Sequence, residues 1–180
     1  MRLKDGDAMA KVIWLTGISG SGKTTLGERL KEELGKKYGH VEFIDGDLVR
    51  EFFENDLGYT RKERIFNVKR IAFAAMLVAK NGTNVVVANI APYYEVRDFI
   101  RKHIKNYIQI YLEANIGICK ERDIKGIYNQ VKVGKIKNVV GVDDVYDEPR
   151  KPDLIVDTQN ESIEQSFEKI IGFLKEKGLI

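Results

Sequence analysis

The sequence predicts a doubly wound α/β fold, in which helices cover both faces of a five-stranded parallel sheet. Five short apolar runs alternate along the chain with segments of helical periodicity, and a glycine-rich turn follows the first run directly. Strands that are apolar throughout are typical of parallel sheets buried on both faces. We expect the strands at residues 12–16, 41–45, 85–88, 107–112 and 154–156.

Helical periodicity fills most of the chain between these strands. The longest pattern covers residues 61–80, where apolar side chains recur at the three- and four-residue spacing of one helix face. We expect further helices at residues 24–38, 48–54, 95–103, 116–123 and 162–175.

The length of the chain indicates one domain. With 180 residues it is long enough for one well-filled core and too short for two ordinary domains, so we expect a single domain at residues 1–180. Residues 124–148 depart from regular periodicity, with three glycines, scattered lysines and an acidic cluster. Structureless connections of this length are uncommon in compact domains and are usually functional or disordered. We interpret this segment as a mobile lid.

Composition excludes several classes of partner. The formal charge of +3 comes from 30 basic and 27 acidic residues that are mixed along the chain, so we expect no nucleic-acid partner. No run approaches the roughly 18 to 20 apolar residues of a membrane span, and the N-terminus lacks the apolar region of a leader. Cys119 is the only cysteine, which excludes an internal disulfide and favours a cytoplasmic location.

A phosphate-binding motif lies between the first strand and the first helix. Gly17, Gly22, Lys23 and Thr24 have the Walker A spacing in the strand–loop–helix context that this motif requires. Backbone N–H groups of such a loop surround the phosphates of ATP, the lysine reaches the β- and γ-phosphates, and the threonine hydroxyl binds Mg²⁺. The ATP-binding residues predicted from the motif are Gly17, Ser19, Gly20, Ser21, Gly22, Lys23, Thr24 and Thr25.

Paired carboxylates after the second strand favour a kinase over a motor ATPase or a switch. The third strand runs into Asn89 without the carboxylate that those proteins place there, whereas Asp45 and Asp47 follow the second strand. Ligands of parallel sheets bind beyond the carboxyl ends of the strands, so both acids should face the loop. We expect Lys23, Asp45 and Asp47 to be catalytic, with Asp45 joining Thr24 at the metal. The alternative for Asp47 is that it only caps a helix beginning at Leu48.

A dense set of cations follows the acids and could clamp an anionic acceptor. Arg64 and Asn67 lie one helical turn apart within it. For any single member, a solvated helix face is the competing interpretation. The cations are Arg50, Arg61, Lys62, Arg64, Lys69 and Arg70.

The chain resembles the adenylyl-sulfate kinase (APS kinase) family from about residue 11 to about residue 171. The most specific matches are FIDGDLVR at residues 43–50 and GKIKNVVGVDDVYDEP at residues 134–149. Further matches are GISGSGKTT at residues 17–25, DLGYTRKER at 56–64, NVKR at 67–70 and CKERDIKGIY at 119–128. The resemblance implies a P-loop kinase that transfers the γ-phosphoryl group of ATP to the ribose 3′-hydroxyl of adenosine 5′-phosphosulfate. It also implies a homodimer.

The resemblance assigns roles to individual residues. Arg50, Arg64 and Asn67 would hold the anionic 5′ group of the acceptor, and Tyr59 would replace a phenylalanine that stacks on its base. Arg122 would lie near the adenine of ATP. Further acceptor-binding residues would be Ile90 on the pocket wall and Lys125, Lys137 and Val139 from the lid.

Departures from the family pattern gather on the acceptor side. The stretch Phe-Ile-Ser-Pro-Tyr-Arg of the family is here residues 89–94, in which Asn89, Ala91 and Tyr94 differ. Ala91 has no hydroxyl, which excludes a phosphoserine and leaves direct transfer. Val139 replaces an aromatic residue, which favours as an alternative acceptor a nucleotide conjugate with a smaller base, such as a cytidine diphosphate derivative. A non-catalytic nucleotide switch is the minor alternative.

Overall fold

A parallel sheet with β1 at its centre organises the computed structural model, which describes residues 10–123 and 125–180. Within these residues the sheet has five strands in the order β2-β3-β1-β4-β5, and every neighbouring pair is parallel. This confirms the predicted fold class. The strands are β1 (Val12–Thr16), β2 (Val41–Asp45), β3 (Asn84–Ala88), β4 (Tyr107–Glu113) and β5 (Leu154–Asp157).

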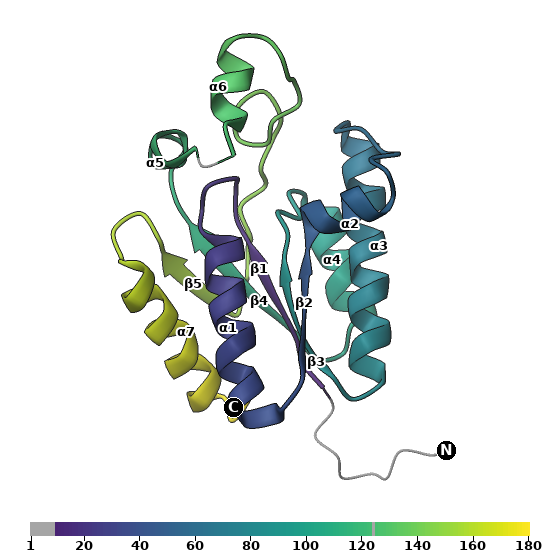
Figure 1. Ribbon diagram of the computed structural model, residues 1–180, viewed down its shortest axis with the longest axis vertical. Helices are drawn as coiled ribbons and strands as arrows, with labels where there is room; N and C mark the ends of the chain where they lie inside the picture. The colour runs from purple at the N-terminus through teal and green to yellow at the C-terminus, as the bar shows by residue number, and fades with distance from the viewer. Residues whose placement is uncertain (1–9, 124) are drawn as a thin grey trace.

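Helices connect the strands and cover both faces of the sheet. Figure 1 shows α1 and α7 on one side of the sheet and α3 and α4 on the other. The helices are α1 (Lys23–Tyr38), α2 (Gly46–Phe52), α3 (Arg61–Lys80), α4 (Tyr94–His103), α5 (Ile116–Arg122), α6 (Ile127–Lys132) and α7 (Ile163–Glu176).

The alternation of side chains along β1 divides the core into two layers. Val12 and Trp14 pack in the cluster that contains buried residues of α3 and α4. Ile13 and Leu15 point the other way, into the cluster of α1 and α7. All four side chains are buried, because successive residues of a strand face opposite sides of a sheet that helices cover twice.

The strand register brings three loops to one edge of the sheet. Leu15 pairs with Ala88, and Ala88 pairs with Asp45, so β1, β3 and β2 end side by side. The residues that follow these ends are therefore neighbours although they lie far apart in the sequence. This edge is the one at which ligands of open α/β sheets bind.

Two details of the helices differ from the sequence-based expectation. The helix expected at residues 48–54 begins at Gly46, and its cap is Asp45, whose Oδ1 accepts from Asp47 N at 2.8 Å. The interpretation of Asp47 as a cap was therefore wrong, and its carboxylate is not used for capping α2. Helix α6 was not expected at all, because it has six residues between Gly126 and Val133 with no extended apolar period.

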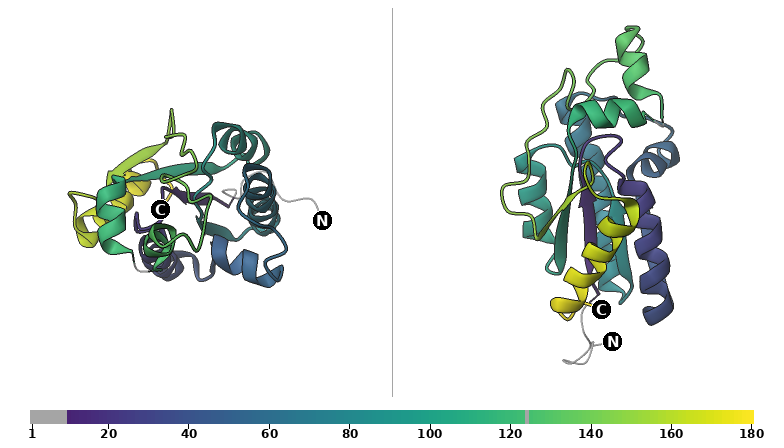
Figure 2. Two further views of the ribbon diagram at one scale, coloured as in Figure 1. Left: turned by 90° about the horizontal axis from the view of Figure 1, so that it is seen from above. Right: turned by 90° about the vertical axis from the view of Figure 1, so that its left-hand side faces the viewer.

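The segment predicted as a lid lies above the carboxyl ends of the strands (Figures 1 and 2). Its residues Tyr128, Val139 and Val140 share a buried cluster with Ile18 of the phosphate loop and Cys119 of α5. Its mobility remains a prediction. The expected ranges 1–180 and 124–148 include residues 1–9 and 124, which lie outside the described residues. Among the described residues, no helix is both long and apolar enough to cross a membrane.

Candidate active site

The glycine-rich loop joins β1 to α1 and is shaped by glycines with positive φ. Gly17, Gly20 and Gly22 have φ of 151°, 82° and 93°. A Cβ added to Gly17 would meet the Leu112 carbonyl oxygen and Ser21 Oγ at 2.6 Å. Other residues rarely adopt such φ values, so the loop can turn its N–H groups inward only with glycine at these positions.

Lys23 begins α1 and lies within the loop. Its Nζ donates to the Ile18 carbonyl at 2.7 Å. Burial and then the charge of Lys125 lower the pKa of Lys23 to about 8, against the opposing effect of Asp47. A desolvated ammonium interacts strongly with an anion, so phosphates in this loop would favour the charged form of Lys23.

Thr24 and Asp45 form a candidate metal site. Thr24 Oγ1 donates to Asp45 Oδ2 at 2.9 Å, while Asp45 Oδ1 caps α2. In the part of the chain that the structure describes, no three His, Cys, Asp or Glu side chains cluster as a metal site. A hydroxyl and one carboxylate suit Mg²⁺, which usually keeps several waters and takes other ligands from phosphates.

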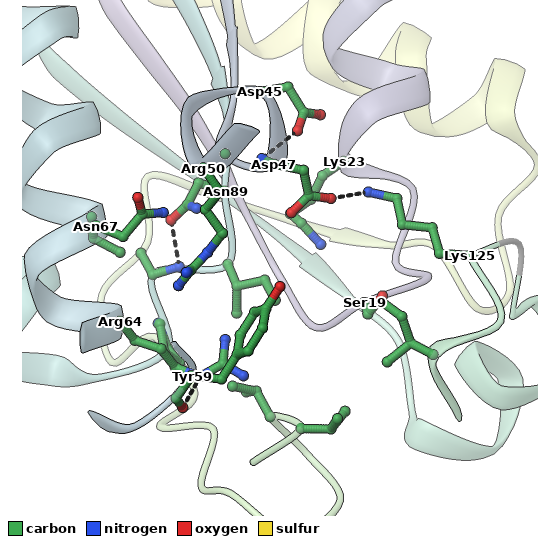
Figure 3. A pocket seen from close by; sticks show the side chains of 18 of the residues that line it. Ser19, Lys23, Asp45, Asp47, Arg50, Tyr59, Arg64, Asn67, Asn89 and Lys125 are labelled. Carbon is green, nitrogen blue, oxygen red and sulfur yellow. Dashed lines mark hydrogen bonds and ion pairs between the residues drawn. The ribbon is translucent and has the colours of Figure 1, made fainter. Parts of the chain in front are cut away.

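Asp47 projects from the first turn of α2 toward the phosphate loop. Its side chain is 70% exposed and forms an ion pair with Lys125 (Figure 3). Burial lowers the pKa of Lys125, but the Asp47 carboxylate outweighs burial, so the net shift is upward. The carboxylate is thus held at the mouth of the site by a residue from the opposite wall.

A cavity of about 420 Å³ lies beside the acids, a volume suited to a nucleotide-sized ligand. Every residue assigned to the acceptor by resemblance lines it, although the residues come from α2, the loop between α2 and α3, α3, the loop after β3 and the lid segment. They are Arg50, Tyr59, Arg64, Asn67, Ile90, Lys125, Lys137 and Val139.

Two arginines lie close to the Tyr59 ring, which remains 51% exposed in this cavity. The Arg50 guanidinium lies 4.5 Å from the ring centroid and donates to the carbonyls of Leu57 at 2.9 Å and Gly58 at 3.1 Å. The Arg64 guanidinium lies 5.1 Å from the same ring and donates to the Tyr59 carbonyl. Burial lowers the pKa of Arg64. Both cations therefore have positions set by the protein before an anion arrives.

Arg97 is a buried arginine of α4 that the sequence analysis did not select. It donates to the Ala91 carbonyl at 2.7 Å and to the Asp147 carbonyl, and so ties the loop after β3 to the end of the lid segment. Ala91 has a φ of 41°, which non-glycine residues rarely adopt. The flanking apolar residues Val96 and Ile100, at the core-facing positions of α4, were the signal in the sequence that this helix is buried.

The phosphate loop also borders a second cavity, of about 520 Å³. Arg122 lines it and donates to the Gly20 carbonyl at 3.3 Å. Gly17 does not line it, so its part is to shape the loop. All other predicted ATP-binding residues line this cavity. One wall was not predicted from the sequence, and it is formed by Thr158, Glu161, Ser162, Ile163 and Ser166.

The cavities meet at the phosphate loop. Ser19, Lys23, Thr24 and Lys125 line both of them. A ligand in one cavity and a ligand in the other would therefore approach the same ammonium groups, next to the carboxylate of Asp47 (Figure 3). This arrangement suits the transfer of a charged group between two substrates.

Comparison with known proteins shows relatives that match nearly the whole chain. The family model for adenylylsulphate kinase matches residues 9–157. The adenylyl-sulfate kinase of Halothermothrix orenii is 38% identical over 93% of this chain and 91% of that protein. The enzyme of the same name from Rippkaea orientalis is 39% identical over 93% of each. The Mycobacterium tuberculosis APS kinase CysC, solved with AMPPNP and APS, has a TM-score of 0.86 at 31% identity, covering 93% of this chain and 98% of that one.

Proposed function

This chain belongs to the adenylylsulphate kinase family, and from that premise we propose that it phosphorylates adenosine 5′-phosphosulfate on its ribose 3′-hydroxyl, with ATP as donor. The product would be 3′-phosphoadenosine 5′-phosphosulfate, the activated form of sulfate. The observation that carries the proposal is the meeting of the two cavities at Lys23 and Thr24, within reach of Asp45 and Asp47.

The chain's own residues supply the parts that phosphoryl transfer needs. Lys23 stabilises the charge that builds on the γ-phosphoryl oxygens, because its ammonium is already desolvated and positioned. Asp47 accepts the proton of the acceptor hydroxyl as the new O–P bond forms and the bond to the β–γ bridging oxygen breaks, which releases ADP. Since Ala91 offers no hydroxyl, transfer is direct.

Magnesium belongs to the proposal as a cofactor. The Thr24 hydroxyl and the Asp45 carboxylate would hold the ion, and their mutual distance of 2.9 Å places both oxygens at one point beside the loop. When bound, Mg²⁺ supplies charge neutralisation to the phosphates.

The acceptor cavity fits a nucleotide with an anionic 5′ group. Arg50 and Arg64 supply charge for that group, and the Tyr59 ring supplies a face for stacking of the base. Ile90 and Val139 add apolar surface, and Lys137 adds a cation from the lid segment.

We further propose a cytoplasmic homodimer. Support for the dimer comes from apolar side chains on the outer face of α3, where Phe66 and Phe73 are exposed. Light scattering of the purified protein should give twice the chain mass of 20.6 kDa, and a monomer would contradict this part of the proposal.

The decisive experiment compares acceptors under identical ATP and Mg²⁺. We expect phosphorylation of adenosine 5′-phosphosulfate at micromolar concentration, measured by ADP release and by identification of the product. The panel includes 5′-substituted adenosine and cytidine nucleotides. Good turnover of a cytidine conjugate beside an unmeasurable rate with adenosine 5′-phosphosulfate would overturn the assignment of the acceptor.

A further inference from the structure

Asn89 follows β3 in the acceptor cavity, and the backbone orients its side-chain amide. Ala91 N donates to Asn89 Oδ1 at 3.0 Å. A backbone N–H is only a donor, so Oδ1 must face Ala91 and Nδ2 must face the opposite way. Trp14 Nε1 donates to the Asn89 carbonyl at 3.1 Å and holds the main chain in place. The direction of the amide is therefore set without a ligand.

Asn89 Nδ2 lies beside the acid pair. A Cβ added to Gly46, the residue between Asp45 and Asp47, would overlap Nδ2. Asn89 lines the acceptor cavity, and none of the hydrogen bonds among the described residues uses its Nδ2. An amide donor is thus available next to the carboxylate that we assign to the acceptor hydroxyl.

Asn67 is a second amide on the wall of this cavity. It is 2% exposed, and its buried Oδ1 has no hydrogen-bond partner among the described residues. Figure 3 shows Asn67 and Asn89 on the Arg50 side of the cavity, away from Ser19 and Lys125. Buried polar groups without partners are costly, so such groups at a binding site indicate a polar ligand.

We propose that Asn89 is a specificity-determining residue whose Nδ2 donates a hydrogen bond to the ribose hydroxyl next to the one that is phosphorylated. Arg50 and Arg64 serve the anionic 5′ group and Tyr59 serves the base, which leaves the sugar as the part of the acceptor beside Gly46. The assignment rests on the proposed function and specifies how the same site recognises its acceptor.

The test combines enzyme variants with a substrate that lacks the hydroxyl. Asn89→Asp keeps an oxygen that accepts from Ala91 N but removes the donor. The values of kcat/KM are measured for adenosine 5′-phosphosulfate and its 2′-deoxy analogue, and their ratio is compared between enzymes. A carboxylate oxygen in the place of Nδ2 can accept a hydrogen bond from the 2′-hydroxyl, so Asn89→Ser, which has no carboxylate, is measured beside Asn89→Asp. Asn84→Asp is the matched control, because Asn84 Oδ1 accepts from Lys11 N at the other end of β3.

We expect the wild type and Asn84→Asp to lose about tenfold in kcat/KM without the 2′-hydroxyl, as for one lost hydrogen bond. For Asn89→Ser the loss should fall below about twofold. The shorter serine hydroxyl can still accept from Ala91 N, and Asn89→Ala carries the same comparison if Asn89→Ser does not fold.

Equal ratios in the wild type and the Asn89 variants, or a wild-type ratio near one, would overturn the assignment of Asn89 alone. A wild type without activity toward adenosine 5′-phosphosulfate would overturn the proposed function, and this assignment with it. Melting temperatures within a few degrees of the wild type show that the variants compare folded enzymes.

Discussion

The donor and acceptor sides of the site are built in opposite ways. On the donor side, residues 17–25 form one continuous stretch that comprises the phosphate loop after β1 and the first residues of α1. On the acceptor side, the cavity is assembled from α2, α3, the loop after β3 and the lid segment. The phosphate-binding part of the donor side is therefore encoded locally, whereas the rest of the donor cavity and the whole acceptor side exist only once the chain has folded.

The forces that hold the two sides differ as well. Glycine backbone conformations shape the phosphate loop. Hydrogen bonds from arginine side chains to backbone carbonyls shape the acceptor wall, where Arg50 and Arg64 hold residues 57–59 and Arg97 holds Ala91. Loss of the positioned charge in the phosphate loop should therefore abolish transfer, and changes on the acceptor wall should weaken the binding of one substrate.

Lys23→Ala should have the largest effect, because the γ-phosphoryl group loses its positioned charge. We expect kcat to fall by at least about a thousandfold, measured as single-turnover transfer with saturating ATP. Lys31→Ala, an exposed position on the same helix, should keep the wild-type rate. A wild-type rate of transfer with Lys23→Ala would show that the donor site does not lie at Lys23.

Asp47→Asn tests the residue at which the two sides meet. Loss of a general base should lower kcat by about a hundredfold or more while the KM for ATP changes less than about threefold. Steady-state kinetics with varied ATP separates these effects. Asp98→Asn, which changes an exposed aspartate of α4, serves as the control. An increase in the KM for ATP at constant kcat would assign Asp47 to the donor side instead.

Arg97→Lys should affect the acceptor side alone. Lysine keeps the charge but loses the two-pronged contact with the Ala91 and Asp147 carbonyls, so the loop that carries Ala91 loses its support. We expect the KM for the acceptor to rise about tenfold and the KM for ATP to stay within about twofold. Arg101→Lys, an exposed change on the same helix, should leave both constants unchanged. Equal rises in both constants would show that Arg97 supports the whole site.

Tyr128→Phe should have the smallest effect. The Tyr128 hydroxyl donates to the Ser19 carbonyl at 2.7 Å and connects α6 to the phosphate loop. Loss of one such bond should lower kcat/KM for ATP about threefold. Tyr38→Phe removes the same kind of bond to the Leu179 carbonyl, far from the site, and should change nothing. A larger loss with the acceptor than with ATP would contradict the assignment of the Tyr128 hydroxyl to the donor side.

The fold could be predicted because the strands are apolar throughout and the helices are long. Each predicted strand lies within one residue of its observed bounds, and the helix at residues 61–80 matches α3 fully. Helix α6 escaped prediction because its six residues are stabilised by packing of Tyr128 and its neighbours against the phosphate loop. The sequence did not identify Asp45 as the cap of α2, because Asp45 and Asp47 are both residues that can cap a helix.

The site could be predicted where a motif is contiguous. The spacing of the glycines identifies the phosphate loop in the sequence. Arg97, in contrast, cannot be told from other arginines of amphipathic helices in the sequence, because its contacts with Ala91 and Asp147 form only in the folded chain. The sequence marked Asn89 only by the carboxylate that it lacks and by its departure from the family pattern. The proposed role of Asn89 depends on the direction of its side-chain amide, which the sequence alone does not specify.

The contact between Gly46 and Asn89 also restricts how this sequence can change over evolutionary time. A side chain at position 46 would collide with the amide at position 89 as the Ala91 N–H orients it, so position 46 is restricted for as long as that amide keeps its place. A smaller residue at position 89 must therefore come before a larger residue at position 46. If residue 46 changed first, its side chain would displace the Asn89 amide. The acid pair thus keeps its central glycine for as long as the residue that follows β3 remains an asparagine.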